Sequence, residues 1–342
     1  MRNMRRTGEQ VARAGRRGHT LAALSFALLL CAAPAGAQPV VELAAQPGHV
    51  ALGVASPEGA PLQLAPAVNL VLRCARPWEL RVVAQGGFAP FAAGPEIPAG
   101  RLFCHLAGES TWWALSSAEP KLIAQGGPTL GQWRTLSLDL RLEPSWEDRA
   151  GSYRGALRIE VYVEGRCLAA QTVTISFDIA PAIALETSVA RLDIGRVESE
   201  HTPAALGVPF EALASLTTNE LIERVGVLAS KALPGAFRAK VRSNAPWVVK
   251  ARVARPFEVV ESAASGPARQ LPARRVSVRC GAGQFIPLSE EEPIVVASGG
   301  PTGADGVEVS LDVRVELLLL DPAGPIEGAI SFTAEAFQPS EG

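Results

Sequence analysis

The sequence predicts an all-β protein made of two tandem immunoglobulin-like antiparallel β-sandwich domains that are related by internal duplication. Three observations support this prediction. One passage of the chain occurs twice, apolar residues alternate with a period of two, and the 342 residues include 32 Gly and 27 Pro to form turns. Alternation of this kind, interrupted by frequent turn residues, is typical of sandwiches of short strands.

The repeat is visible letter by letter. Residues 137–143 read Ser-Leu-Asp-Leu-Arg-Leu-Glu, and residues 310–316, which lie 173 positions later, read Ser-Leu-Asp-Val-Arg-Val-Glu. Small residues that follow each passage keep the same spacing: Ala150, Gly151, Gly155 and Ala156 return as Ala323, Gly324, Gly328 and Ala329. A duplication of this length indicates two copies of one domain rather than a stack of short repeats.

The first 37 residues have the features of a signal peptide. Six arginines precede an apolar stretch at 21–33, and Ala35-Gly36-Ala37 forms a cleavage sequence before Gln38. The apolar stretch is shorter than the roughly 20 residues that a membrane span needs. We therefore expect residues 1–37 to be removed and the mature chain to be exported, with no transmembrane segment.

Two domains are expected in the mature chain, at 38–181 and 182–342. The offset between matched positions grows from 142 near the start of the copies to 173 at their ends, which places an insertion at about 198–234 of the second copy. Within the insertion, 219–231 is the best helical candidate of the chain.

Strand patterns follow one another along each copy. Apolar residues alternate with polar ones over 68–74, 136–142 and 172–179 in the first copy, and over 237–243 and 309–315 in the second. This pattern is typical of half-buried antiparallel strands. About seven short strands in about 130 residues predict a sandwich. A closed barrel is the alternative that fits the same pattern.

Three tryptophans are predicted to lie in the core. Trp78 and Trp247 begin a strand in each copy after a proline, and recurrence in both copies favours a structural role over ligand stacking. Trp113 is matched by Ile286 and is also expected to pack inside.

Trp133 and Trp146 have no aromatic counterpart in the second copy, where Gly306 and Leu319 stand in their places. Exposed aromatic side chains can stack on a sugar ring or a protein partner, and Glu143 supplies a nearby polar group. We take Trp133, Trp146 and Glu143 as candidate ligand-binding residues, with plain packing as the alternative. The recurring Arg101, Asp139 and Arg141 are expected to form a surface ladder of opposite charges.

Four cysteines remain after cleavage, namely Cys74, Cys104, Cys167 and Cys280. An even number in an exported chain favours disulfides. Cys74 and Cys104 lie on inward faces and are both replaced in the second copy, so we expect them to be bonded to each other. The pairing of Cys167 and Cys280 stays open.

Composition and missing motifs limit the function. Without its leader the chain has 26 basic and 33 acidic residues and no long basic tract, which argues against nucleic acid as a partner. No zinc, calcium, phosphate-loop or nucleophile–base motif is present, so no cofactor or metal is predicted. A hydrolase with a site assembled from distant residues is the remaining enzymatic alternative.

Two short passages carry a resemblance to known families. Trp78-Glu79-Leu80 resembles the W-x-L signature of WxL-type cell-surface proteins. The passage 150–157 is similar to a segment of spore-coat-U-like and pilus-like β-sandwiches. The resemblance implies an exported bacterial surface domain, and its WxL part implies wall binding.

The sequence therefore predicts an exported, non-catalytic structural or adhesive protein of the periplasm, cell surface or extracellular space. Its expected partner is an envelope protein or a polysaccharide. The strand edges are also expected to allow oligomerisation. The alternative is a carbohydrate-binding module that uses the exposed tryptophans of the first domain.

Overall fold

A computed structural model describes residues 41–187, 229–259, 269–317 and 326–337 of the chain. The described residues form four β-sheets and two short 3₁₀ turns, so the all-β prediction is confirmed. The predicted leader and most of the insertion at 198–234 lie outside the described residues. No helix in the described ranges has the length and apolar character needed to cross a membrane.

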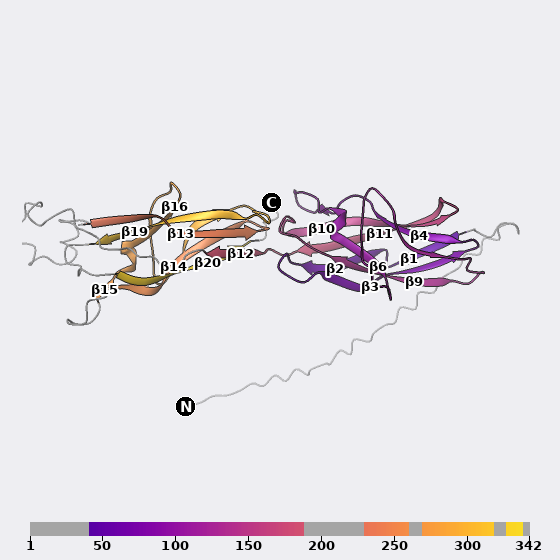
Figure 1. The fold of residues 1–342 in the computed structure, drawn as a ribbon, viewed down its shortest axis with the longest axis horizontal. Helices are drawn as coiled ribbons and strands as arrows, with labels where there is room; N and C mark the ends of the chain where they lie inside the picture. Colours follow the sequence, from indigo (N-terminus) through magenta and orange to yellow (C-terminus); the bar gives the residue numbers. More distant parts are fainter. Residues whose placement is uncertain (1–40, 188–228, 260–268, 318–325, 338–342) are drawn as a thin grey trace, which may run out of the picture. The chain divides into compact units, whose positions relative to one another are not determined.

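The strands from 41 to 179 form two sheets that face each other, here called the N-terminal sandwich (Figure 1). One sheet has the order β1-β3-β9-β6-β7, and the other has the order β2-β11-β10-β4-β8, with β5 beside β10. The bounds are β1 (Val41–Gln46), β2 (His49–Ala55), β3 (Leu62–Cys74), β4 (Trp78–Ala84), β5 (Ala89–Pro90), β6 (Leu102–Leu106), β7 (Trp113–Ala114), β8 (Lys121–Gly126), β9 (Arg134–Leu142), β10 (Gly151–Val163) and β11 (Arg166–Ile179).

The strands from 183 to 336 form the other two sheets, here called the C-terminal sandwich. One has the order β12-β13-β19-β16-β17, and in the other β14 pairs with β15, β18 and β20. The bounds are β12 (Ile183–Thr187), β13 (Ala229–Ser243), β14 (Trp247–Val259), β15 (Arg269–Leu271), β16 (Val276–Cys280), β17 (Ile286–Pro287), β18 (Ile294–Gly299), β19 (Val307–Leu317) and β20 (Ile326–Ala336).

All pairs of described strands are antiparallel except one. β2 runs parallel to β11, with Val50 opposite Ile175, so the sheet edge formed by β2 departs from the purely antiparallel prediction. In the part of the chain that the structure describes, the sheets keep open edges and do not close into a barrel. The helical prediction for 219–231 is wrong at its end, because Ala229–Lys231 belong to β13; the rest lies outside the described residues.

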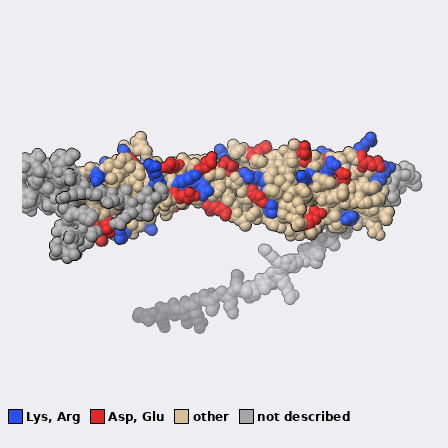
Figure 2. All heavy atoms as spheres, viewed as in Figure 1, with Lys and Arg blue, Asp and Glu red and all other residues tan. Residues whose placement is uncertain are grey.

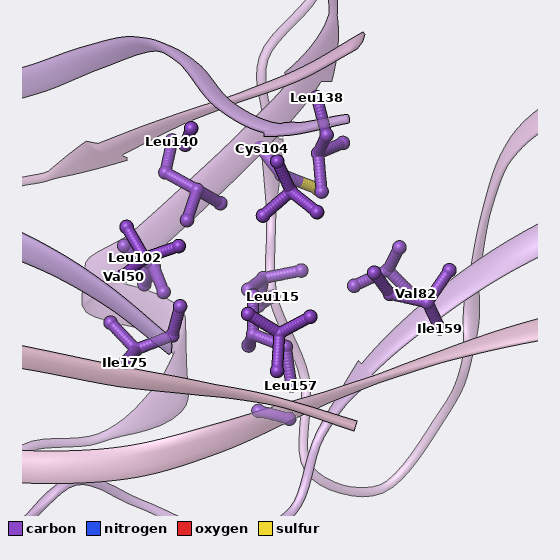
Figure 3. Close-up of a cluster of buried hydrophobic side chains, with 14 of the residues drawn as sticks. Val50, Val82, Leu102, Cys104, Leu115, Leu138, Leu140, Leu157, Ile159 and Ile175 are labelled. Atoms are coloured by element: carbon purple, nitrogen blue, oxygen red, sulfur yellow. The ribbon is translucent and has the colours of Figure 1, made fainter. Parts of the chain in front are cut away.

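The core of the N-terminal sandwich follows from the period of two. Residues that point inward from both sheets, such as Leu102 and Leu140 on one side and Leu157 and Ile159 on the other, are fully buried (Figure 3). Outward residues of the same strands are mainly polar, and on the face that Figure 2 shows, basic and acidic side chains are interspersed. This is the arrangement expected of a sandwich whose two inner faces share one core.

The strand orders of the two sandwiches correspond. β3-β9-β6-β7 is matched by β13-β19-β16-β17, and short 3₁₀ turns at Ala99–Arg101 and Ala273–Arg275 precede β6 and β16. Glycines at matching positions lie against the tryptophan that begins the neighbouring strand: Trp78 faces Gly126, and Trp247 faces Gly299. A Cβ at either glycine would lie within 2.7 Å of the indole, so only glycine fits there. The origin of the two copies by duplication stays a prediction.

Candidate interaction surfaces

The two sandwiches differ at one sheet edge. In the N-terminal sandwich, β10 is paired along both edges, with β11 on one side and β4 on the other. In the C-terminal sandwich, the matching strand β20 pairs with β14 on one side. Among the described residues, no strand pairs with the opposite edge of β20. An edge of this kind presents a row of backbone N–H and C=O groups that can pair with another strand.

Burial of the two strands differs accordingly. The two strands can be matched through the tryptophans of their neighbours. On β20, Ala336 lies opposite Trp247 of β14, and on β10 the register with β4 extends to place Val163 opposite Trp78. Positions on β10 and β20 therefore match at an offset of 173. Leu157, Ile159 and Val161 of β10 are each 0% exposed. Their counterparts on β20 are Ile330, Phe332 and Ala334, which are only partly buried and pack at the margin of the core.

The missing neighbour would have a defined chemistry, which β11 illustrates. Its residues Val173, Ile175, Phe177 and Ile179 point inward and are at most 3% exposed. The residues between them are mainly polar. Phe177 closes the core against two rings: its centroid lies 5.2 Å from that of Phe88, edge-on, and 5.7 Å from that of Tyr153. Within the described ranges, no extended segment with apolar side chains at every second position covers this edge of β20.

A second surface lies at the turn between β8 and β9. The backbone N–H of Gln132 donates to the carbonyl of Thr129 at 3.0 Å, and the two residues between them have positive φ, 51° at Leu130 and 79° at Gly131. Thr129 fixes the turn to β3, because its N–H donates to the Cys74 carbonyl at 2.8 Å and its hydroxyl accepts from the Cys74 N–H at 3.1 Å.

The side chains of this turn project into solvent. Leu130 is 88% exposed and Trp133 is 52% exposed. The guanidinium of Arg73 lies 4.9 Å from the centre of the Trp133 ring and is paired with Glu42. Two large apolar side chains thus stand together on a turn that the sandwich holds in place.

The predicted ladder of Arg101, Asp139 and Arg141 is not formed, because Arg101 pairs with Asp148 and Arg141 with Glu143. Asp139 is buried and pairs instead with a histidine that the sequence reasoning missed. His105 Nε2 lies 3.0 Å from Asp139 Oδ2, and both side chains are about one tenth exposed. The His105 ring also stacks on Trp112, with centroids 4.0 Å apart. The pair His105–Asp139 was detectable only through the strand register, which places the two residues opposite each other.

The matching carboxylate in the C-terminal sandwich is better satisfied. Asp312 accepts a hydrogen bond from the Gly235 N–H at 2.7 Å and one from Arg279 Nε at 2.8 Å, and the first of these contacts contributes most to lowering its pKa. Gly235 lies in a bulge of β13, and the matching bulge of β3 has Pro66 at that position. Proline has no N–H to donate. Asp139 Oδ1 is accordingly buried without a partner.

The predicted disulfide between Cys74 and Cys104 is wrong. Both residues are free and buried. The register explains why they do not meet. Leu72 lies opposite Arg134 of β9, and Cys74 lies two residues farther from Cys104, which is opposite Leu140. The six residues from Arg134 to Leu140 already span about 20 Å, far beyond the roughly 7 Å between Cα atoms that a disulfide tolerates. Burial raises the pKa of the Cys104 thiol to about 12, so it is not a thiolate nucleophile at neutral pH. Cys167 and Cys280 are free and exposed.

The candidate ligand residues do not form one site. Trp133 precedes β9, whereas Glu143 and the partly buried Trp146 follow it. The nine residues of β9 separate them by about 30 Å, so the two indoles cannot contact the same sugar ring. Glu143 is paired instead with Arg141 at 2.7 Å. Of the three, Trp133 alone lies at the exposed turn.

The predicted core tryptophans occupy different depths. Trp78 and Trp247 are 2% and 4% exposed. The Trp247 indole N–H donates to the Gly300 carbonyl at 2.8 Å, whereas Trp78 Nε1 is buried without a partner. Trp113 is partly buried at the margin of the core, with Lys121 Nζ 4.9 Å from its ring centre.

Within the described ranges, no group of three or more His, Cys, Asp or Glu side chains could hold a metal ion. A shallow depression of about 800 Å³ lies beside Trp247, lined mainly by Gly299–Thr302 and Gly306–Ser310. Its lining also includes Cys280, Glu308 and Ser310.

Comparison with known proteins found no matching family model and no matching curated protein. The resemblance to WxL-type and spore-coat-U-like proteins therefore stays a prediction. Several solved structures show a remote likeness. The adhesive subunit CfaE of the CFA/I fimbria of enterotoxigenic Escherichia coli has 10% identity and a TM-score of 0.37, over 85% of this chain and 93% of that one.

A chaperone–tip adhesion subunit complex from the archaic chaperone-usher Csu pili of Acinetobacter baumannii has 10% identity and a TM-score of 0.36, over 84% of this chain and 98% of that one. A family 123 glycoside hydrolase from Clostridium perfringens has 10% identity and a TM-score of 0.26, over 41% of this chain and 27% of that one. Scores this low allow no inference about function.

Proposed function

We propose that this chain is an exported, non-catalytic structural or adhesive protein of the cell envelope or extracellular space, and that it binds a protein partner by accepting a β-strand along β20. The observation that carries the proposal is the difference between β10, which is paired along both edges, and β20, which is paired along one.

The physical argument for strand addition has two parts. Backbone groups along an open edge gain hydrogen bonds when an extended segment adds to the sheet. In addition, Ile326, Ile330 and Phe332 lose their remaining contact with water when apolar side chains of the added strand cover the core. Since β20 has 11 residues, an added strand of similar length would match it.

The N-terminal sandwich predicts the register of the added strand. Phe177, Ile175 and Val173 lie opposite Tyr153, Gly155 and Leu157 of β10. The matching positions on β20 are Ile326, Gly328 and Ile330. We therefore expect apolar residues of the partner to lie opposite these three positions, with polar residues between them.

A peptide copying residues 168–179 of β11 tests the proposal directly. We expect it to bind the chain spanning residues 38–342 and to raise the unfolding temperature of the C-terminal sandwich. The matched control is the same peptide carrying V173S, I175S and F177S, which keeps the backbone and removes the apolar side chains. Fluorescence anisotropy measures binding, and hydrogen exchange locates it on β20 or on β10.

Two substitutions in the chain separate the proposed site from nonspecific binding. Ile330→Lys places a charge on the inward side of β20 and should weaken peptide binding, whereas Thr333→Lys lies on the exposed side and should not. Absence of binding, together with β20 amides that exchange as slowly as those of β10, would show that the edge is already covered and would end the proposal.

A further inference from the structure

The turn between β8 and β9 holds a leucine in a backbone conformation that disfavours it. Leu130 has φ of 51°, in the left-handed region where a non-glycine residue is strained. Thr302 of the C-terminal sandwich makes the same anchoring bonds as Thr129, with its N–H on the Ser243 carbonyl at 2.8 Å and its hydroxyl accepting from the Ser243 N–H at 2.8 Å. The residue after Thr302 is Gly303, with φ of 69°, which suffers no such strain.

Packing does not explain why a leucine stands at position 130. Its side chain is 88% exposed, and a Cβ built on the flanking Gly127 or Gly131 would meet no atom within 4 Å. The turn is therefore a projection and not the wall of a pocket. Residues held in strained backbone conformations cluster at functional sites, so the strain at Leu130 motivates the search for a contact there.

The surroundings of the projection are basic. The adjoining turn segments 73–76, 130–134 and 164–166 contain Arg73, Arg76, Arg134 and Arg166. The acidic residues beside them are Glu42, paired with Arg73, and Glu164, whose Oε1 lies 2.8 Å from Arg76 Nη1. Four arginines against two glutamates leave this end of the sandwich with an excess of two positive charges.

We propose that this end of the N-terminal sandwich, here called the Leu130–Trp133 tip, binds the surface of an anionic phospholipid bilayer. Leu130 would enter the acyl boundary, Trp133 would lie at the headgroup level that indole rings prefer, and the arginines would face the phosphates. An apolar projection flanked by arginines fits the surface of an anionic bilayer. A sugar would need a flat or concave platform of aromatic and polar groups.

Flotation with lipid vesicles tests the proposal. The probe is a vesicle of phosphatidylcholine with one quarter phosphatidylglycerol, and the protein is the chain spanning residues 38–342. Leu130→Gly removes the apolar side chain and also relieves the strain, so it should fold at least as well as the parent chain. We expect this variant to float about tenfold less, and Trp133→Ser to be reduced to a similar degree.

The matched control is Phe91→Ser. Phe91 is 67% exposed, and its backbone N–H donates to Ser152 at the opposite end of β10, away from the tip. This variant should float like the parent chain. Absence of flotation by the parent chain, or equal flotation of Leu130→Gly, would overturn the proposal.

Two further outcomes would also overturn it. Parent-chain binding that disappears in high salt as completely as that of Leu130→Gly would show charge attraction alone. Binding to a glycan array or to a soluble protein that Trp133→Ser abolishes, without vesicle binding, would assign the tip to that other partner. Strand addition at β20 involves neither residue, so failure of one proposal leaves the other standing.

Discussion

The two sandwiches have the same strand order but different completeness. In the N-terminal sandwich, β11 covers the edge of β10 and fully buries the side chains along it. In the C-terminal sandwich, the matching residues of β20 remain partly exposed, and no described strand covers their edge. The difference teaches that one neighbouring strand decides whether the side chains along such an edge are fully or only partly buried.

The largest expected effect compares the covering strand with the uncovered one. Phe177→Ala removes a ring that is 3% exposed and packed on Phe88 and Tyr153, and should cost about 3–5 kcal/mol. Phe332→Ala should cost about 1–2 kcal/mol, because part of that ring is already in water. Urea unfolding measures both values. Equal losses would contradict the view that the two edges differ in burial.

A smaller effect is expected where a glycine of each strand lies against a phenylalanine ring. A Cβ at Gly155 would lie 2.5 Å from Phe88 Cδ1, and one at Gly328 would lie 2.2 Å from Phe257 Cδ1. Substitution by alanine overpacks either core and should cost about 1–3 kcal/mol. We expect Gly155→Ala to be the more damaging, because β11 prevents β10 from moving away and β20 has more freedom. Thermal unfolding of both variants gives the order, and the reverse order would count against an open edge.

The matched carboxylates predict a difference in acid. The pKa of Asp312 is lowered by the Gly235 N–H and by Arg279, so its contribution to stability is present above the unfolded pKa of about 4 and is lost as pH falls through the folded value. Asp312→Asn should lower stability at pH 7 by about 1 kcal/mol and flatten the loss below pH of about 4. Urea unfolding from pH 7 to 2.5 tests this. An unchanged acid limb would mean that Asp312 makes no such contribution.

Asp148 of the N-terminal sandwich provides the opposite case. Burial raises its pKa, and hydrogen bonding from the Ser145 N–H opposes that effect. Its protonated form is therefore favoured by folding, so its contribution is greatest below the unfolded pKa and declines as pH rises through the folded value. Asp148→Asn should shift the same pH series in the opposite sense to Asp312→Asn.

The smallest expected effect concerns the reactivity of the cysteine thiols. A maleimide reagent should label Cys167 and Cys280 in the native chain, one in each sandwich, and leave the buried Cys74 and Cys104 unmodified. After unfolding without a reductant, all four thiols of residues 38–342 should react. A count of two under those conditions would restore a disulfide that the strand register excludes.

The positions of the strands and their inward faces were largely predictable because side-chain alternation is a local property of extended backbone. Leu102 with Cys104, and Leu138 with Leu140, are inward in the structure as their period of two indicates. The tryptophans that begin β4 and β14 were likewise identified by their recurrence in both copies. Neither pattern required knowledge of which strands pair.

Pairing itself was not predictable, and the errors trace to it. Cys74 and Cys104 share an inward face, yet the register of β9 keeps them apart. Trp133 and Trp146 are close in sequence, yet β9 runs between them. Asp139 recurs as Asp312, but the bulge opposite each carboxylate determines whether a backbone donor is present, and only register shows that Pro66 takes the place of Gly235.

By itself, the sequence determined that the chain forms short strands with one apolar face each, because burial of alternate side chains is written in their order. The tertiary structure alone decided which edges are covered and which side chains meet, since strand pairing joins residues far apart in the chain. The edge of β20 that no described strand covers and the strained Leu130 are both products of that long-range assembly. The first depends on which strand lies alongside, and the second on the bonds that hold Thr129 to β3.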